Sequence, residues 1–154
     1  MPADARSTND DLLNLTIANR ADELRRVADW LERATEHFGW SERTVFKLDL
    51  VLNEALPNII SYAYANQEIH HIRIRLEDQP DQVVLEIRDD GIAFDPFAEV
   101  RRPEAGSLAS ASIGGRGILL ILAFSAAQEY QRIGQTNLMR VRLDKQSIND
   151  QPSP

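Results

Sequence analysis

Residues 41–62 read SERTVFKLDLVLNEALPNIISY, and this stretch predicts an amphipathic helix with two functional groups on its flank. Ser41 is a good N-cap for such a helix. Apolar residues recur at alternating steps of three and four, the period of one helix face, at Val45, Leu48, Leu52, Ala55, Ile59 and Tyr62. Glu54 and Asn58 stand four residues apart beside this stripe, so their side chains project as neighbours.

This polar pair has a functional and a structural interpretation. A carboxylate that takes a proton, one turn from an amide oxygen that holds a cation, is half of a phosphoryl-transfer site. The structural alternative is a solvated helix flank, the commoner arrangement of polar residues at this spacing. Pro57 lies between Glu54 and Asn58 and usually costs about 3 kcal/mol inside a helix. It predicts a bend that exposes the carbonyl of Asn53 or re-aims Asn58.

A second segment, IRDDGIAFDP at residues 87–96, combines an acidic residue at a strand end with a glycine. The Asp89 carboxylate could accept the exocyclic amine of adenine, and Gly91 would let the backbone approach the base without a Cβ in the way. The alternative is a plain turn. Adenine would fit a pocket of this kind.

A third segment, IGGRGILL at residues 113–120, places glycines directly before an apolar helix. Backbone amides at a helix N-terminus form an anion site that suits a polyphosphate, although flexible glycines are commonly just a loop. The Walker lysine is absent, and Leu120 replaces the third glycine of the dinucleotide fingerprint. The three segments therefore require a different nucleotide-binding fold.

The rest of the chain predicts further elements around the central helix. A strand over 12–18 is followed by residues 19–22, which supply capping chemistry for a helix that runs to about residue 38. This helix ends at Gly39, and its expected buried residues are Leu24, Val27, Leu31, Ala34 and Phe38. Strands over 69–76 and 82–88 flank a turn at 77–81, and an irregular lid covers 92–113. A helix over 117–124 is followed by strands over 127–133 and 138–143, joined by a turn at 134–137.

This order predicts an α+β fold: a two-layer α/β sandwich with a mixed, mostly antiparallel sheet and helices on one face. We expect one domain over residues 12–144, between a flexible N-terminus at 1–11 and a flexible tail at 145–154.

Composition excludes several classes of function. The net charge of −7 over 154 residues gives no general attraction to nucleic acid or anionic lipid. The absence of cysteine excludes disulfides, thiolate catalysis and cysteine-based metal sites. Residues 1–10 show no secretory pattern, and the apolar run 118–124 is far shorter than the roughly 20 residues that cross a bilayer. We expect a cytoplasmic protein with no direct nucleic-acid or membrane partner.

Histidines and serines give no stronger candidates. His37, His70 and His71 lack metal-ligand spacing, so exposed or structural roles are the better interpretation. The serines at 107, 110, 112 and 125 lie in no Gly-x-Ser-x-Gly elbow, so hydrolase chemistry is unsupported.

In order and approximate spacing, the three segments resemble the N box, G1 box and G2 box of the GHKL ATPase superfamily. The fold of that superfamily, the Bergerat fold, binds ATP beneath a mobile lid. Within it the chain looks most like the anti-sigma-factor serine/threonine protein kinases, over roughly residues 12–143. The matching residues are Asn53-Glu54-Ala55 through Asn58, Tyr62-Ala63-Tyr64, Asp89-x-Gly91, Phe94-Asp95-Pro96 and Gly114-Gly115-x-Gly117.

The resemblance implies a role for each site residue. Glu54 would be the general base for a protein hydroxyl, Asn58 would hold Mg²⁺ between the phosphates, and Asp89 would read the adenine of ATP. The remaining nucleotide-binding positions would be Gly91 and Ala93 near the base and Gly114, Gly115, Arg116 and Gly117 around the phosphates. Ser61 stands where related sequences often carry a basic residue, whose charge Arg116, Arg101 or Arg102 could supply.

The implied reaction transfers the ATP γ-phosphoryl group to a Ser or Thr of a STAS-domain anti-sigma antagonist. The same protein, as a homodimer, would sequester a sigma factor in a partner-switching circuit. The alternative is a nucleotide-gated regulatory binding module without phosphotransfer, which the departures at Pro57 and Ser61 favour. A histidine kinase catalytic half fits less well, because His37 lies in no phosphoacceptor context and the segment before Glu54 is short for a dimerisation domain.

Overall fold

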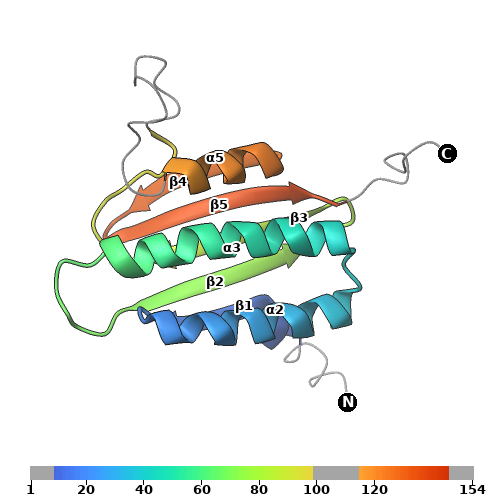
Figure 1. The fold of residues 1–154 in the computed structure, drawn as a ribbon, viewed down its shortest axis with the longest axis horizontal. Helices are drawn as coiled ribbons and strands as arrows, with labels where there is room; N and C mark the ends of the chain where they lie inside the picture. The colour runs from blue at the N-terminus through green and yellow to red at the C-terminus, as the bar shows by residue number, and fades with distance from the viewer. Residues whose placement is uncertain (1–8, 99–114, 146–154) are drawn as a thin grey trace.

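The computed structural model describes residues 9–98 and 115–145, which fold into a sheet layer and a helix layer (Figure 1). Residues 9–13 are helical. The elements that follow are β1 (Asn14–Ala18), the 3₁₀ turn η1 (Ala21–Glu23), α2 (Leu24–Phe38), α3 (Glu42–Tyr62), β2 (His71–Asp78), β3 (Gln82–Asp89), α5 (Gly115–Phe124), β4 (Ala127–Ile133) and β5 (Thr136–Asp144).

The sheet has five strands in the order β1-β2-β3-β5-β4, and every neighbouring pair is antiparallel. The predicted α+β class with a mostly antiparallel sheet is therefore confirmed, and the expected parallel part of a mixed sheet does not occur among these five strands. The pairing of β3 with β5 matters most for the site, because its register places Asp89 opposite Asn137. The prediction of a turn over 134–137 is wrong in part, since Thr136 and Asn137 already belong to β5.

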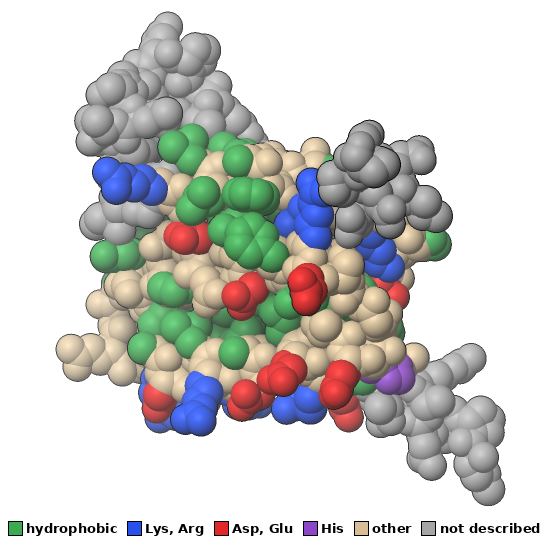
Figure 2. Space-filling model, turned by 45° about the vertical axis from the view of Figure 1, so that its right-hand side comes forward, with side chains coloured by type: hydrophobic (Ala, Val, Ile, Leu, Met, Phe, Trp, Pro, Cys, Tyr) green, Lys and Arg blue, Asp and Glu red, His purple; other side chains and the backbone are tan. Residues whose placement is uncertain are grey.

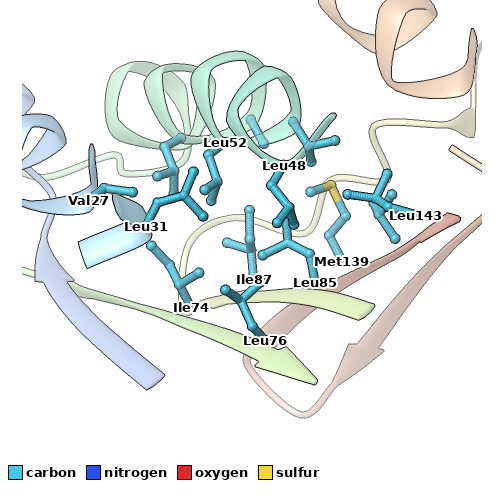
Figure 3. Packing of buried hydrophobic residues seen from close by; sticks show 14 of the residues in the cluster. Val27, Leu31, Leu48, Leu52, Ile74, Leu76, Leu85, Ile87, Met139 and Leu143 are labelled. Carbon is cyan, nitrogen blue, oxygen red and sulfur yellow. The ribbon is translucent and has the colours of Figure 1, made fainter. Parts of the chain in front are cut away.

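Helices α2, α3 and α5 cover one face of the sheet (Figure 1). In β2 the side chains alternate between exposed and buried, because successive residues of a strand point to opposite faces. The inward residues of β2, β3 and β5 meet those of α2 and α3 in one apolar core, part of which Figure 3 shows: Val27, Leu31, Leu48, Leu52, Ile74, Leu76, Leu85, Ile87, Met139 and Leu143. This packing fixes α3 against the middle of the sheet.

Helix α3 begins where the sequence predicts. The Ser41 hydroxyl accepts a hydrogen bond from the Thr44 backbone N–H at 3.2 Å, which caps the helix. The helix continues through Pro57 to Tyr62, so Pro57 does not interrupt it between Glu54 and Asn58. A proline inside a helix removes its own backbone donor and crowds the carbonyl four residues before it, and the packed face of α3 offsets this loss of stability.

The buried face of α3 is broader than its predicted stripe. Leu48, Leu52 and Ala55 are buried as expected, but Val51 and Leu56 are fully buried as well. A helix flanked by α2 and α5 over a sheet buries more than one narrow stripe. The prediction for Tyr62 is wrong: its side chain is 53% exposed, because it lies at the last turn of the helix.

The starts of β1 and β2 also differ from the prediction. The 12–18 strand begins only at Asn14, because residues 12 and 13 belong to the helical segment before it. The strand predicted over 69–76 begins at His71, and Ile69 is 67% exposed. Backbone and side-chain hydrogen bonds between Asn19 and His70 close the end of the β1–β2 pair. Of the predicted lid over 92–113, residues 99–113 lie outside the described residues.

Helices α3 and α5 run side by side in opposite directions (Figure 1). At one end Phe46 of α3 and Phe124 of α5 meet edge to face, with ring centroids 5.5 Å apart. Both rings are partly exposed, and Figure 2 shows apolar side chains gathered on this side of the molecule. This contact leaves the C-terminal half of α3 facing the first turn of α5, where the predicted site residues lie.

Candidate functional site

A cavity of about 300 Å³ lies between the C-terminal half of α3, the loop after β3 and the start of α5, above β4 and β5. Its size is at the lower end of the range for small-molecule sites. The walls are mostly apolar, and the side chains among them that carry polar groups come from four elements, α3, β3, β4 and β5. The lining residues are Ala55, Asn58, Ile59, Tyr62, Ala63, Asp89, Ile92, Phe94, Pro96, Ile118, Tyr130, Asn137 and Met139.

Asp89 lies at the end of β3 and supplies the buried carboxylate of this cavity, with 7% of its surface exposed. Its Oδ1 atom accepts hydrogen bonds from the Gly91 backbone N–H at 2.9 Å and from Asn137 Nδ2 at 3.0 Å. Its Oδ2 atom accepts none from the described residues. One oxygen therefore fixes the carboxylate, while the other is available to a ligand that donates a hydrogen bond.

Gly91 is required by the protein's own packing. A Cβ at this position would lie 2.6 Å from both the Cβ and the carbonyl oxygen of Ala63, and 2.9 Å from Asp89 Oδ1. The same Ala63 carbonyl accepts a hydrogen bond from the Ile92 backbone N–H at 2.8 Å. The glycine therefore lets the loop after β3 close onto the end of α3.

Replacing Gly91 by Ala is expected to lower the free energy of unfolding by about 1–3 kcal/mol, because backbone and side chain must move apart to admit the methyl group. The shift of the urea midpoint at constant m-value measures this loss. Ala93→Ser in the same loop is the control, since Ala93 is exposed and its substitution should change stability by less than about 0.5 kcal/mol. Equal midpoints for Gly91→Ala and the parent protein would contradict the packing argument.

Glu54 and Asn58 lie on α3 as the sequence predicts, but in different positions relative to the cavity. Asn58 lines the cavity, whereas Glu54 is partly buried at its edge. A Cβ on Gly117 would lie only 2.2 Å from Glu54 Oε2, so the carboxylate rests against the first turn of α5. This location suits an acidic group, because backbone N–H groups point out of the first turn of a helix.

The other predicted site residues differ in how close they lie to the cavity. Gly115 and Gly117 both lie in the first turn of α5, whereas a helix over 117–124 was expected. Arg116 and Ala93 are exposed and do not line the cavity, although Ile92 and Phe94 on either side of Ala93 do. Gly114, together with Arg101 and Arg102, lies outside the described residues. The cavity thus brings together Asn58 and Asp89, with Glu54 and Gly117 in contact at its edge.

Tyr130 and Asn137 are cavity residues that the sequence did not single out. The alternation of β4 places Tyr130 and Arg132 on the helix-covered face, but an isolated alternating strand gives no sign of which cavity it borders. Asn137 was hidden in an apparent turn, a context in which asparagine needs no functional explanation. Only the register of β5 with β3 brings it to Asp89.

A second group of side chains supports the loop beside Asp89. His70 lies 3.2 Å from Asp90 and 2.7 Å from Asn66, and its ring stacks on Tyr64 at 4.4 Å. The Tyr64 hydroxyl is buried without a hydrogen-bond partner in the described part of the chain. Burial, and then the nearby carboxylates of Asp89 and Asp90, raise the pKa of the Tyr64 phenol above its ordinary value. The phenol therefore stays neutral beside the acidic loop.

Comparison with known proteins identifies the fold family. The sequence matches the family described as "Histidine kinase-like ATPase domain" over residues 17–145, which include α2, α3, α5, strands β2 to β5 and every residue that lines the cavity. The chain belongs to the histidine kinase-like ATPase family. The resemblance to the GHKL ATPase superfamily that the sequence suggested is thereby confirmed.

Relatives of this histidine kinase-like ATPase domain include a serine/threonine-protein kinase and an anti-sigma factor. One is the serine/threonine-protein kinase BtrW of Bordetella bronchiseptica, 36% identical over 126 residues that cover 82% of this chain and 87% of BtrW. The other is an anti-sigma F factor of Oceanobacillus iheyensis, 29% identical over 83 residues that cover 54% of this chain and 57% of that protein.

Among solved structures, the ATPase domain resembles the blue-light activated histidine kinase of Erythrobacter litoralis EL346. The TM-score is 0.50 at 16% sequence identity, over 68% of this chain and 31% of that chain. At this identity the likeness concerns the fold alone. Within residues 9–98 and 115–145, no helix combines the length and apolar character needed to cross a bilayer.

Proposed function

We propose that this protein is a cytoplasmic ATP- and Mg²⁺-dependent serine/threonine protein kinase of a partner-switching circuit. One observation carries the proposal: Asn58 and Asp89 line a single cavity, and Glu54 lies against Gly117, each of these two being next in sequence to a lining residue, Ala55 or Ile118. These positions supply a base, a cation ligand and an adenine acceptor on rigid elements around one space. The 36% identity to a serine/threonine protein kinase over most of both chains supports the same conclusion.

The cavity residues fit the adenine ring of ATP. Apolar side chains such as Ile59, Ile118 and Met139 form walls for a flat heterocycle. Asp89 presents one unengaged carboxylate oxygen for the exocyclic amino group. The first turn of α5 offers backbone N–H groups to the phosphates, since these groups have no intrahelical partner.

Asn58 fits a role at Mg²⁺. The described residues contain no group of three or more His, Cys, Asp or Glu side chains that could hold a metal by themselves. Mg²⁺ does not require such a group, because it keeps several waters and is bound by one or two protein oxygens together with substrate phosphates. When bound, the ion would neutralise phosphate charge; the role of this chain is to offer the Asn58 amide oxygen inside the cavity.

Glu54 is the proposed base for the substrate hydroxyl. Its carboxylate has neither a hydrogen bond nor an ion pair with any residue of 9–98 or 115–145, so it can accept a proton. Its place at the cavity edge suits a group that meets a hydroxyl arriving from a second protein, rather than one enclosed with the nucleotide. In the transfer, the Ser or Thr oxygen bonds to the γ-phosphorus, the bond to the ADP oxygen breaks, and the hydroxyl proton passes to Glu54.

The proposed protein substrate is a STAS-domain anti-sigma antagonist, and the proposed second partner is a sigma factor held by a homodimer of this chain. The likeness to an anti-sigma F factor supports this assignment. Incubation with γ-labelled ATP, Mg²⁺ and candidate STAS proteins tests it directly. We expect label on a Ser or Thr of one candidate, together with ADP.

A nucleotide-gated binding module without phosphotransfer is the second candidate. It is favoured by exposed Ser61, which supplies no positive charge where related kinases often carry a basic residue. Under this alternative, ATP would change sigma-factor affinity while no label reached any STAS protein. Label transfer that depends on the protein would exclude it.

Replacing Asn58 by Ala is expected to weaken binding of Mg²⁺-ATP. If the lost oxygen ligand contributes about 1.4 kcal/mol, the affinity falls about tenfold. A thermal shift titration measures this, since ligand at 100 times its Kd stabilises the fold by roughly 2.7 kcal/mol. Asn53→Ala is the matched control, because Asn53 is exposed on the same helix and does not line the cavity. An equal loss with and without Mg²⁺ would rule out the metal role.

A further inference from the structure

Asn137 uses all of its hydrogen-bonding capacity inside the protein. Its Nδ2 group donates to Asp89 Oδ1 at 3.0 Å and to the Ile92 carbonyl at 2.8 Å. Its Oδ1 atom accepts from the Tyr130 hydroxyl and from Arg132 Nη1, the latter at 3.0 Å. A side-chain amide has two donor hydrogens and two acceptor sites, so none remains for a ligand. Although Asn137 lines the cavity, it does not itself read the base.

The orientation of this amide is determined by its surroundings. A carboxylate and a carbonyl, which only accept, lie on the nitrogen side, and Arg132, which only donates, lies on the oxygen side. Turning the amide over would place acceptors against acceptors. Because Asn137 is also buried, with 6% of its surface exposed, the network specifies one arrangement.

Arg132 extends this arrangement to the loop after β3. Its Nη1 atom also donates to the Gly91 carbonyl at 2.8 Å, and its Nε atom donates to the Gly134 carbonyl at 3.1 Å. The sheet register places Asp89, Asn137 and Arg132 in one row across β3, β5 and β4. The β4–β5 hairpin therefore holds the Gly91 and Ile92 carbonyls and the Asp89 carboxylate together.

This network, Asn137 with Tyr130 and Arg132, leaves Asp89 a single free acceptor with a fixed direction. The carboxylate cannot rotate without breaking the bonds that its Oδ1 atom accepts from Gly91 and Asn137. A purine with an amino group at position 6 can donate to Oδ2. In a purine with an oxygen at position 6, that oxygen would face Asp89 Oδ2. Both atoms only accept hydrogen bonds, so both would be left without a donor.

We propose that Asn137, held by Tyr130 and Arg132, is the positioning residue that gives the site its selectivity for 6-amino over 6-oxo purine nucleotides. The proposal rests on the proposed function, because it takes the cavity as the purine site. The selectivity between the two kinds of purine would then depend on the fixed orientation of the Asp89 carboxylate and not only on the presence of an acid at this position. A loosened carboxylate could turn away from the base, which would weaken its bond to a 6-amino group and relieve its repulsion from a 6-oxo group.

ATP and inosine triphosphate are the probes, because their bases differ at position 6. Calorimetric titration of the full chain should give ATP binding that is tighter by roughly 10–100-fold in the parent protein. Asn137→Leu should reduce this ratio about tenfold and Tyr130→Phe about threefold, chiefly by weakening ATP. Tyr130→Phe keeps the ring in the cavity wall and removes only the hydroxyl that orients Asn137.

Tyr64→Phe is the matched control, because it also removes a partly buried phenol hydroxyl near Asp89, but one with no hydrogen-bond partner in the described residues. Its ratio should equal that of the parent. A purely structural role of the network would lower thermal stability and leave the ratio of the two affinities unchanged, since both nucleotides titrate the same folded molecules.

An unchanged ratio in both Asn137→Leu and Tyr130→Phe would overturn the proposal while leaving the kinase proposal intact. Equal affinity of the parent for the two nucleotides would do the same. If the parent bound neither nucleotide, both proposals would fall. If the ratios changed as expected but no STAS protein were labelled, only the phosphotransfer proposal would fail.

Discussion

Replacing Glu54 by Gln is expected to reduce phosphotransfer by roughly 10²–10⁴-fold, the usual contribution of a positioned general base. Glutamine has the shape of glutamate but cannot take the proton of the substrate hydroxyl. Binding of ATP should change little, because Glu54 stands at the edge of the cavity and does not line it. The measurement is the initial rate of label transfer to the STAS substrate, beside a calorimetric titration with Mg²⁺-ATP.

Asp49→Asn is the matched control for this experiment. Asp49 is an exposed acid on the same helix, and its change removes the same charge without touching the cavity. Transfer by Asp49→Asn should equal that of the parent. A Glu54→Gln variant with full transfer would dispose of the assigned base, whereas loss of ATP binding together with transfer would show that Glu54 acts on the nucleotide.

Replacing Gly117 by Ala is expected to lower both stability and phosphotransfer. The added methyl carbon would lie 2.2 Å from Glu54 Oε2 and 3.0 Å from Cδ, so the carboxylate must move. Oε2 is the far end of a flexible side chain, so the loss of stability should be small, about 1 kcal/mol or less, and only the Glu54 Cβ at 3.3 Å resists the methyl group. Phosphotransfer should fall further, because a displacement of about 1 Å at a catalytic group can cost roughly 10²-fold in rate. Without the clash the sign would reverse, because Ala in a helix is more stable than Gly by about 1 kcal/mol.

A double-mutant cycle separates the clash from other effects of the methyl group. In a Glu54→Ala background, the space beside Gly117 is open, and Gly117→Ala should be neutral or stabilising by up to about 1 kcal/mol. Urea denaturation of the four proteins gives the coupling energy. If Gly117→Ala cost the same in both backgrounds, the contact between Glu54 and α5 would not be its cause.

Local patterns were sufficient for most of the fold. Ser41 and Gly39 mark helix ends in the sequence and act as a cap and a left-handed terminus in the structure, because capping depends on one residue and its nearest neighbours. The strand predicted over 127–133 is β4 with the same boundaries. The errors fall where tertiary contacts decide. Tyr62 fits the apolar stripe of α3 but lines the cavity and is half exposed.

In the candidate site too, some residues could be predicted from the sequence and others only from the tertiary structure. Asp89 and Asn58 were predicted from residue type and spacing, and both border the cavity. Asn137 was not, since asparagine near a glycine turn is explained by the turn alone. For Gly91 the structure adds a reason that the sequence did not give: the space beside it is filled by Ala63, and no spacing rule relates these two residues. Its approach to a base stays a prediction.

The sequence by itself determined the family, the antiparallel two-layer architecture and the identity of the proposed base, cation ligand and adenine acceptor. These features can be predicted because they depend on the periodicity of neighbouring residues and on motifs that are recognised by their order along the chain. Only the tertiary structure decided that Glu54 rests against Gly117 and that Asn137 locks Asp89 with one oxygen free. Both contacts join segments that are remote in the chain, and their geometry is set by strand register and helix packing, which no local pattern encodes.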